Sequence, residues 1–148
     1  MKLAIVTSYP PSKVTLNEYG YHLVKNFVQN QEVSQLILIS DKTNEPKQFD
    51  FENKDKIKLN QCWNFNSYTT FYKIVKAVKK ESPDYVLFNL QFVKFGDKKI
   101  PSALGLLLPM FLRILGFKTV VLLHNILEQV DLEKAGFTNS KILTAVYN

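Results

Sequence analysis

The sequence Thr-Val-Val-Leu-Leu-His-Asn, residues 119–125, decides the fold class. It opens with β-branched residues and leucines only, and so short an apolar run predicts a strand buried on both faces of a parallel sheet. The run ends abruptly in two polar residues, His124 and Asn125. Ligands of open α/β sheets bind at the carboxyl ends of the strands, so we place the candidate site at His124. The alternative is that His124 is a structural residue, whose side chain makes its hydrogen bonds within the protein and contacts no ligand.

Four more apolar runs, at residues 3–7, 36–39, 57–63 and 85–88, predict strands. Helical patterns follow the first, third and fourth of these runs, and they begin near residues 15, 67 and 102. Such alternation predicts an α/β fold with an open, mainly parallel sheet, helices on both faces and right-handed crossovers. A chain of 148 residues fits one domain, residues 1–148.

Several local signals predict details of these helices. Thr15 with Glu18 forms a capping box for the first helix, and Asn66 or Ser67 is the expected N-cap of the second. Gly20 lies on the buried stripe of the first helix, where a missing side chain allows close approach to the sheet. A helical pattern without a C-cap also runs through residues 140–147.

The third helix, from about residue 102, is apolar almost all round. It is therefore buried, covered by a partner or in contact with a membrane surface, and Pro109 is expected to kink or break it. One domain offers such a helix only one partner, so part of its apolar surface is expected to stay uncovered. The residues of that surface are Leu104, Leu107, Leu108, Phe111 and Leu112.

The composition indicates a globular protein and argues against a disordered or a fibrous one. Hydrophobic residues make up 46% and charged residues 22%, as in a globular protein. The single cysteine, Cys62, forms no internal disulfide and supplies no zinc cluster, so we expect no metal and a reducing compartment, by default the cytoplasm. The first apolar run is too short for a secretory signal, and prolines and an arginine interrupt residues 100–115, so we expect no transmembrane helix.

The net charge of +6 is unevenly distributed, with lysines concentrated in residues 73–118. A basic face of this kind can meet an anionic membrane or a phosphorylated ligand, although most surface lysines are merely solvated. Nucleic acid is an unlikely partner, since basic residues interleaved with aromatic ones are its only support. The lysines that we expect to face a membrane are Lys73, Lys76, Lys79 and Lys80.

No familiar catalytic motif is present. The sequence lacks G-x-G-x-x-G, G-x-x-x-x-G-K-[ST] and G-x-S-x-G, so a self-contained hydrolase, kinase or dehydrogenase is unsupported, and we expect no cofactor. Polar residues at the strand ends remain, and a doubly wound sheet brings these together at one edge. The alternative is that strand ends are polar because loops are polar. These residues are Ser8, Tyr9, Ser40, Asp41, Asn89, Gln91, His124, Asn125 and Glu128.

Three segments carry a resemblance to a known family. They are residues 2–11, Lys-Leu-Ala-Ile-Val-Thr-Ser-Tyr-Pro-Pro, residues 82–96, Ser-Pro-Asp-Tyr-Val-Leu-Phe-Asn-Leu-Gln-Phe-Val-Lys-Phe-Gly, and residues 119–125. Their order and spacing resemble the amino-terminal, Rossmann-like domain of GT-B glycosyltransferases, most of all the retaining enzymes of glycosyltransferase family 4. The chain departs from that family at residues 12–15, Ser-Lys-Val-Thr, where the family carries a glycine pair.

The resemblance implies a role on the acceptor side of sugar transfer. In that family this domain binds the acceptor, here a glycan or a lipid-linked molecule, and a carboxyl-terminal domain grips the nucleotide-sugar donor. His124 matches the family's histidine that touches the transferred sugar, so it is the expected catalytic residue. Ser8, Tyr9, Asn89, Gln91, Asn125 and Glu128 are the expected substrate-binding residues.

Two further expectations follow from the resemblance. The donor-gripping domain lies beyond residue 148, so these residues alone should not transfer sugar. The enzyme is expected in the cytoplasm, either free or as a peripheral protein at the inner face of the membrane. The alternative function is a stand-alone, non-catalytic module that binds a phosphorylated ligand or an anionic membrane.

Overall fold

The computed structural model describes residues 1–124, which form a five-stranded, all-parallel open sheet flanked by helices. The strands lie in the order β3-β2-β1-β4-β5, so the predicted Rossmann-like α/β fold is confirmed. In chain order the elements are β1 (Lys2–Val6), α1 (Asn17–Gln29), β2 (Gln35–Asp41), a 3-10 turn (Lys54–Lys56), β3 (Ile57–Trp63), α2 (Thr70–Glu81), β4 (Tyr85–Gln91), α3 (Lys99–Ile114) and β5 (Lys118–His124).

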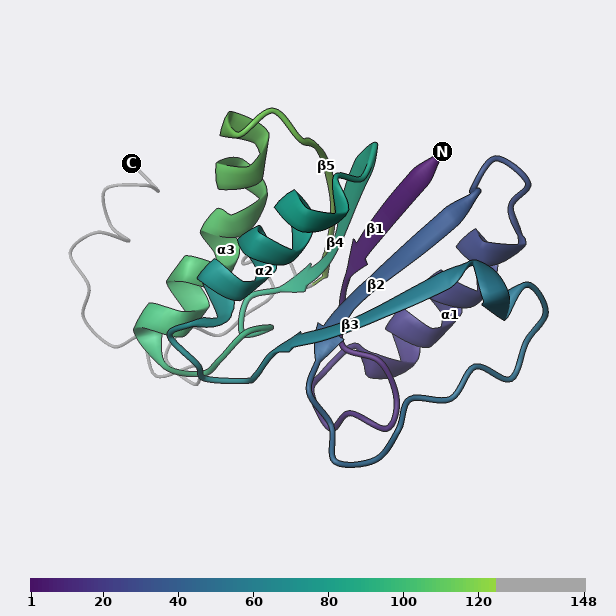
Figure 1. Ribbon diagram of the computed structural model, residues 1–148. Coiled ribbons are helices and arrows are strands. Elements are labelled where there is room, and N and C mark those ends of the chain that lie inside the picture. The colour runs from purple at the N-terminus through teal and green to yellow at the C-terminus, as the bar shows by residue number, and fades with distance from the viewer. Residues whose placement is uncertain (125–148) are drawn as a thin grey trace.

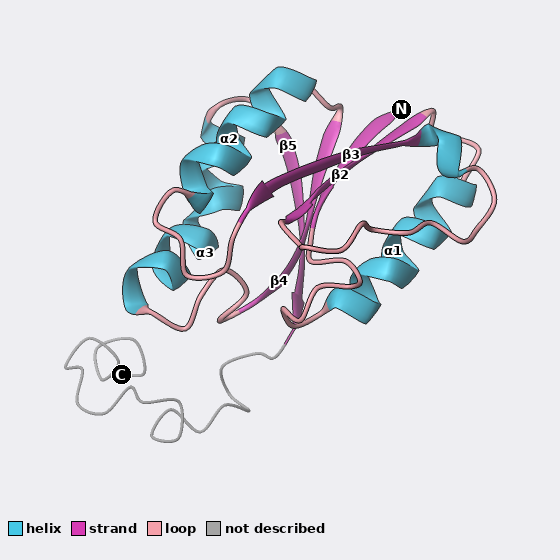
Figure 2. Cartoon of the chain, turned by 60° about the horizontal axis from the view of Figure 1, so that its bottom comes forward, coloured by secondary structure: helices cyan, strands magenta, loops and turns pink. Residues whose placement is uncertain are grey.

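The helices lie in two layers, with α1 on one face of the sheet and α2 and α3 together on the other (Figure 1). Figure 2 shows the same division from a second direction. Each layer encloses its own hydrophobic core. Val24 and Val28 of α1 pack in one core, and Ile74 of α2 packs with Leu108 and other α3 residues in the second. The strands between them alternate their side chains into the two cores.

The expectation that residues 119–123 are buried on both faces is wrong. β5 pairs with β4 and, within residues 1–124, with no second strand, because it lies at the end of the sheet. Val120, Val121 and Leu123 are consequently between 42% and 56% exposed. An apolar run reveals that a segment is a strand, but its position in the sheet depends on pairings that the run does not encode.

The helix caps also differ from the prediction. α1 begins at Asn17, after Leu16 in a left-handed conformation (φ 63°), so Thr15 with Glu18 does not form a capping box. The Thr15 hydroxyl instead accepts a hydrogen bond from Gln91 Nε2. α2 begins at Thr70, and no side chain caps it, so the predicted N-cap at residue 66 or 67 is wrong as well. Thr15 precedes the observed N-cap, Leu16, by one residue, and Asn66 and Ser67 precede Thr69 by three and two residues.

The expected role of Gly20 is confirmed. A β-carbon at this position would lie 2.2 Å from the carbonyl oxygen of Ser8 and 2.7 Å from Thr7 Oγ1. The missing side chain therefore lets α1 lie against the loop that follows β1. This contact fixes residues 7 and 8, which belong to the carboxyl edge of the sheet.

α3 continues through Pro109 from Lys99 to Ile114, so of the two predicted effects of Pro109, a kink or a break, the break is wrong. The expectation that Leu104, Leu107, Leu108, Phe111 and Leu112 share one uncovered surface is wrong in part. Leu108 and Leu112 are fully buried, whereas Leu107 and Phe111 are 46% and 37% exposed. No helix within residues 1–124 is long and apolar enough to cross a membrane.

Candidate functional site

The carboxyl ends of β1 and β4 are neighbours, and the strand order reverses between them. In open α/β sheets this reversal point is where a crevice opens for ligands. β5 follows on the far side of β4, so it delivers His124 to the same edge. Asn89 and Gln91, expected just after a strand, are in fact among the last residues of β4.

His124 is joined to β1 by a chain of hydrogen bonds through buried Asn89. The His124 Nε2 atom lies 2.8 Å from Asn89 Oδ1. Asn89 Nδ2 donates to Thr7 Oγ1 at 2.9 Å, and the Thr7 hydroxyl donates to the Ser8 carbonyl at the same distance. Asn89 and His124, which are distant in sequence, are therefore in direct contact. This agrees with the prediction that polar residues at the strand ends meet at one edge of the sheet.

The direction of this chain fixes the proton on the imidazole. Because the Asn89 amide nitrogen donates to Thr7, its oxygen is the atom that faces His124, and Nε2 must donate to it. In the neutral ring the Nδ1 atom then carries a lone pair. Within residues 1–124 no group donates to Nδ1. The half-buried ring also meets the edge of Tyr19, with ring centroids 4.4 Å apart.

The other predicted residues are distributed around this edge in different ways. Ser8 is fully buried, and its hydroxyl donates to the Thr15 carbonyl at 2.6 Å. Gln91 is also buried and bonds to Thr15. Tyr9 is fully buried in the core on the α1 side, where its hydroxyl donates to the Gln48 carbonyl. Burial raises the pKa of Tyr9 well above its usual range, and its ring packs against Tyr21 and Phe49.

A buried lysine is the main feature that sequence reasoning missed. Lys94, 1% exposed, donates to the Ser8 hydroxyl and, at 2.7 Å, to the Thr15 carbonyl. Burial lowers the pKa of Lys94 to about 7, while the charge of Asp41 opposes this shift. Lys94 thus fastens the loop after β1 to the loop after β4. No local signal distinguishes it from the surface lysines around it.

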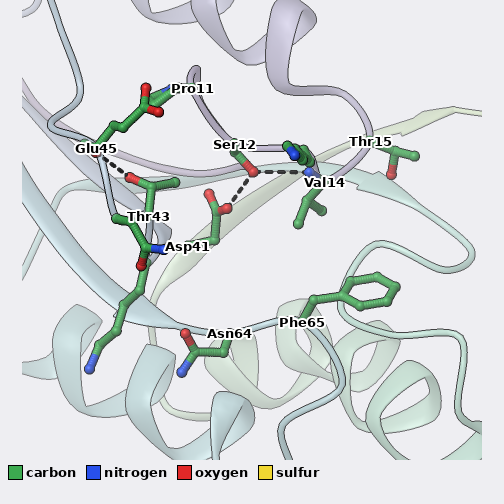
Figure 3. A pocket seen from close by; sticks show the side chains of 12 residues that line it. Pro11, Ser12, Val14, Thr15, Asp41, Thr43, Glu45, Asn64 and Phe65 are labelled. Carbon is green, nitrogen blue, oxygen red and sulfur yellow. Dashed lines mark hydrogen bonds between the residues drawn. The ribbon is translucent and has the colours of Figure 1, made fainter.

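A pocket of about 630 Å³ lies on the other half of the same edge. Its walls come from the loops that follow β1, β2 and β3, and Figure 3 shows Ser12 and Asp41 turned toward one another. The Ser12 hydroxyl donates to Asp41 Oδ2. Buried Lys47 lies 3.5 Å from Asp41 Oδ1, and burial lowers the pKa of this lysine. Asp41 was among the strand-end residues, but nothing in the sequence predicted the pocket.

The remaining predicted residues either fall outside the described residues or lie away from this edge. Asn125 and Glu128, and the helical pattern of residues 140–147, fall outside the described residues. Of the four lysines expected to face a membrane, three are exposed on α2, namely Lys76, Lys79 and Lys80, and Lys73 is half-buried. The carboxyl end of α2 lies near the amino ends of the strands, since Glu81 contacts Lys2 of β1 and Lys58 of β3. Lys79 and Lys80 are therefore at the opposite end of the sheet from His124.

The described part of the chain contains no group of three or more histidine, cysteine, aspartate or glutamate side chains that could hold a metal ion. Comparison with other proteins adds no family assignment. No protein-family model matches the chain, and no curated protein or solved structure matches it either. The functional argument therefore depends on the site itself.

Proposed function

We propose that this chain is the acceptor-side domain of a GT-B type glycosyltransferase, which takes part in moving a sugar from a nucleotide-sugar donor to a glycan or lipid-linked acceptor. The observation that supports the proposal is the His124–Asn89–Thr7 chain of hydrogen bonds. It holds an imidazole at the carboxyl edge of a doubly wound sheet, where such folds bind ligands. The resemblance of residues 2–11, 82–96 and 119–125 to that family leads to the same position.

The chemistry of His124 suits a sugar ligand. Its Nε2 proton is already used by Asn89, so the neutral ring offers Nδ1 as an acceptor for a hydroxyl group. A hydroxyl of the transferred sugar bonded there would be oriented without any covalent step on the histidine. The role of His124 is therefore to contact and orient the sugar, while the donor nucleotide is held by a second domain. No cofactor or metal is needed for this role.

The experiment that tests this function is a transfer assay on the full-length gene product. Purified protein is incubated with a panel of nucleotide-sugars and with membrane extracts that supply glycan and lipid-linked acceptors. We expect one nucleotide-sugar to be consumed with the sugar appearing on an acceptor. A gene product that has no second α/β domain, or that consumes no nucleotide-sugar, would contradict the proposal.

A second candidate function, docking on an anionic membrane surface, is favoured by the outer layer formed by α2 and α3. Figure 1 shows α2 and α3 side by side in one layer; α2 carries exposed Lys76, Lys79 and Lys80, and α3 carries exposed apolar residues. The two helices touch through Phe71 and Phe111, whose ring centroids are 5.1 Å apart. Lysines beside apolar residues are the composition of a peripheral membrane surface. Such docking would place the transferase at the inner face of the membrane, beside a lipid-linked acceptor.

Reversing two charges tests this docking surface. The double variant Lys76→Glu, Lys80→Glu should bind anionic vesicles more weakly, because each lysine near the surface contributes about 1 kcal/mol. Vesicle sedimentation at low and at high salt measures the effect, which should be larger at low salt. The matched control is Lys54→Glu, Lys56→Glu, on the 3-10 turn before β3. Equal binding by the wild-type protein and the α2 variant would show that these lysines are merely solvated.

A further inference from the structure

The pocket between the loops after β1, β2 and β3 is separate from the His124 chain. It is lined by residues 11–15, 41–45, 64 and 65, whereas His124 and Asn89 lie on β5 and β4, on the other side of β1. Its volume of about 630 Å³ falls within the usual range for small-molecule sites. The role proposed for His124 makes no use of this pocket.

A buried carboxylate is the principal polar group of the pocket. Asp41 is 3% exposed, and its Oδ2 atom accepts from the Ser12 hydroxyl. Among residues 1–124 its Oδ1 atom has one long contact, of 3.5 Å, with Lys47 Nζ. An ionised carboxylate has about four lone-pair sites, so Asp41 keeps acceptor capacity for a ligand that donates. The Ser12 contact holds the carboxylate in place, because the same hydroxyl also accepts from the Val14 amide at 3.0 Å.

The opposite wall carries an exposed aromatic ring. Figure 3 shows Asn64 and Phe65 along the bottom of the pocket, with Val14 and Thr15 along the top and Asp41 between them. Phe65 is 40% exposed, and within residues 1–124 it stacks on no other ring. The Asn64 side chain, also exposed, offers both a donor and an acceptor. The walls thus combine an apolar ring with planar polar groups.

The charge of the walls excludes a simple anion site. Lys13 and Lys42 line the pocket, but so do Asp41 and Glu45, and the lysine positions are exposed. The pocket therefore has no excess of positive charge. Phosphate cradles of this fold also need a glycine-rich turn, and Pro-Ser-Lys-Val-Thr stands at residues 11–15 instead. A neutral ligand with several hydroxyl groups fits these walls better.

We propose that this pocket binds a sugar ring, with a vicinal diol of the ring donating to the Asp41 carboxylate and the apolar face of the ring lying against Phe65. Asn64 supplies a further hydrogen bond to a ring hydroxyl. The sugar ring can come from a nucleoside or from a glycan, since both present a vicinal diol and an apolar face.

The experiment has one arm for each source and uses amide NMR spectra of the 148-residue chain. One arm titrates uridine and adenosine, and the other titrates methyl glucoside and methyl galactoside. We expect at least one probe to shift the amide signals of Val14, Thr43 and Asn64. Binding by nucleosides alone assigns the ribose, and binding by glycosides assigns the glycan. Failure of all four probes to shift these signals would overturn the proposal.

Matched deoxy probes test the diol without altering the protein. The 2′-deoxynucleoside, or the methyl 2-deoxyglycoside, should bind at least about tenfold more weakly than its parent, because Asp41 is left with an unpaired acceptor. Equal affinity of parent and deoxy probe would contradict the role of Asp41. This binding measurement is independent of sugar transfer. The probes can therefore fail to bind although the protein transfers sugar, and they can bind although it transfers none.

Two protein variants test the aromatic wall. Phe65→Ala should weaken binding of the same probe by about threefold or more, because a ring contact is lost from an exposed position that contributes little to folding. The control is Tyr68→Ala, a nearby aromatic residue that is 59% exposed and lies outside the pocket. Unchanged affinity in Phe65→Ala, or an equal loss in Tyr68→Ala, would overturn the proposed position of the sugar.

Discussion

Replacing Lys94 by methionine should abolish a large pH dependence of the free energy of unfolding. Burial lowers the pKa of Lys94 to about 7 in the folded protein, against an ordinary value of 10.5. Between these two values the unfolded chain binds a proton that the folded protein does not. The free energy of unfolding therefore rises as the pH is raised through this window, by up to about 1.4 kcal/mol per pH unit for one proton.

Denaturant unfolding of the wild-type protein and Lys94→Met at pH 6, 7, 8 and 9 measures the effect. Below pH 7 both states of the wild-type protein hold the proton, so the difference between the two proteins should be constant there. From pH 7 to 9 the wild-type protein should gain about 2 to 3 kcal/mol relative to Lys94→Met.

An exposed lysine supplies the control. Lys76→Met should keep the pH dependence of the wild-type protein, because Lys76 is in water in both states. Lys47, whose pKa burial also lowers, contributes in the same direction but is present in all three proteins and cancels in the comparison. Parallel curves for the wild-type protein and Lys94→Met would show that Lys94 carries its charge in the folded state throughout.

Gly20→Ala should destabilise the protein by about 3 kcal/mol. The added β-carbon would lie 2.2 Å from the Ser8 carbonyl oxygen, and backbone cannot swing aside as a flexible side chain can. α1 would have to move away from the carboxyl edge. Alanine is the better helix former, so a helix-propensity effect alone would change the stability in the opposite direction.

Thermal and denaturant unfolding of Gly20→Ala measure this loss, and Gln29→Ala, an exposed change on the same helix, is the control. Gln29→Ala should stay within about 0.5 kcal/mol of the wild-type protein. A Gly20→Ala protein as stable as the wild type would mean that the loop after β1 is not fixed by α1. The positions of Thr7 and Ser8 at the edge would then need another explanation.

The sequence predicts the fold well because its strong signals are local. Short apolar runs separated by helical patterns define an α/β sheet, and parallel strands place their carboxyl ends at one edge. That rule places Asn89 and His124 at one edge, and the pairing of β4 with β5 brings them into contact. Gly20 could be interpreted correctly for the same reason, because a glycine on a buried helical stripe indicates a close approach.

The features that escaped prediction depend on tertiary contacts. β5 has the composition of a central strand but is the last strand of the sheet that residues 1–124 form, because strand order is set by crossovers. Lys94 and Lys47 are buried although lysine is almost always exposed, and each is held by carbonyl oxygens from distant loops. Thr15 does not cap α1, and its hydroxyl instead accepts a hydrogen bond from Gln91, which is far along the chain.

The most direct test of the central claim is His124→Ala in the full-length gene product, measured for sugar transfer and for thermal stability together. We expect turnover to fall by at least about tenfold, or roughly 1.4 kcal/mol of transition-state stabilisation, because the sugar loses its contact with Nδ1. The melting temperature should change little, because a half-buried edge residue contributes little to core packing. Unchanged turnover, or a variant that no longer folds, would show that His124 only supports the structure through Asn89.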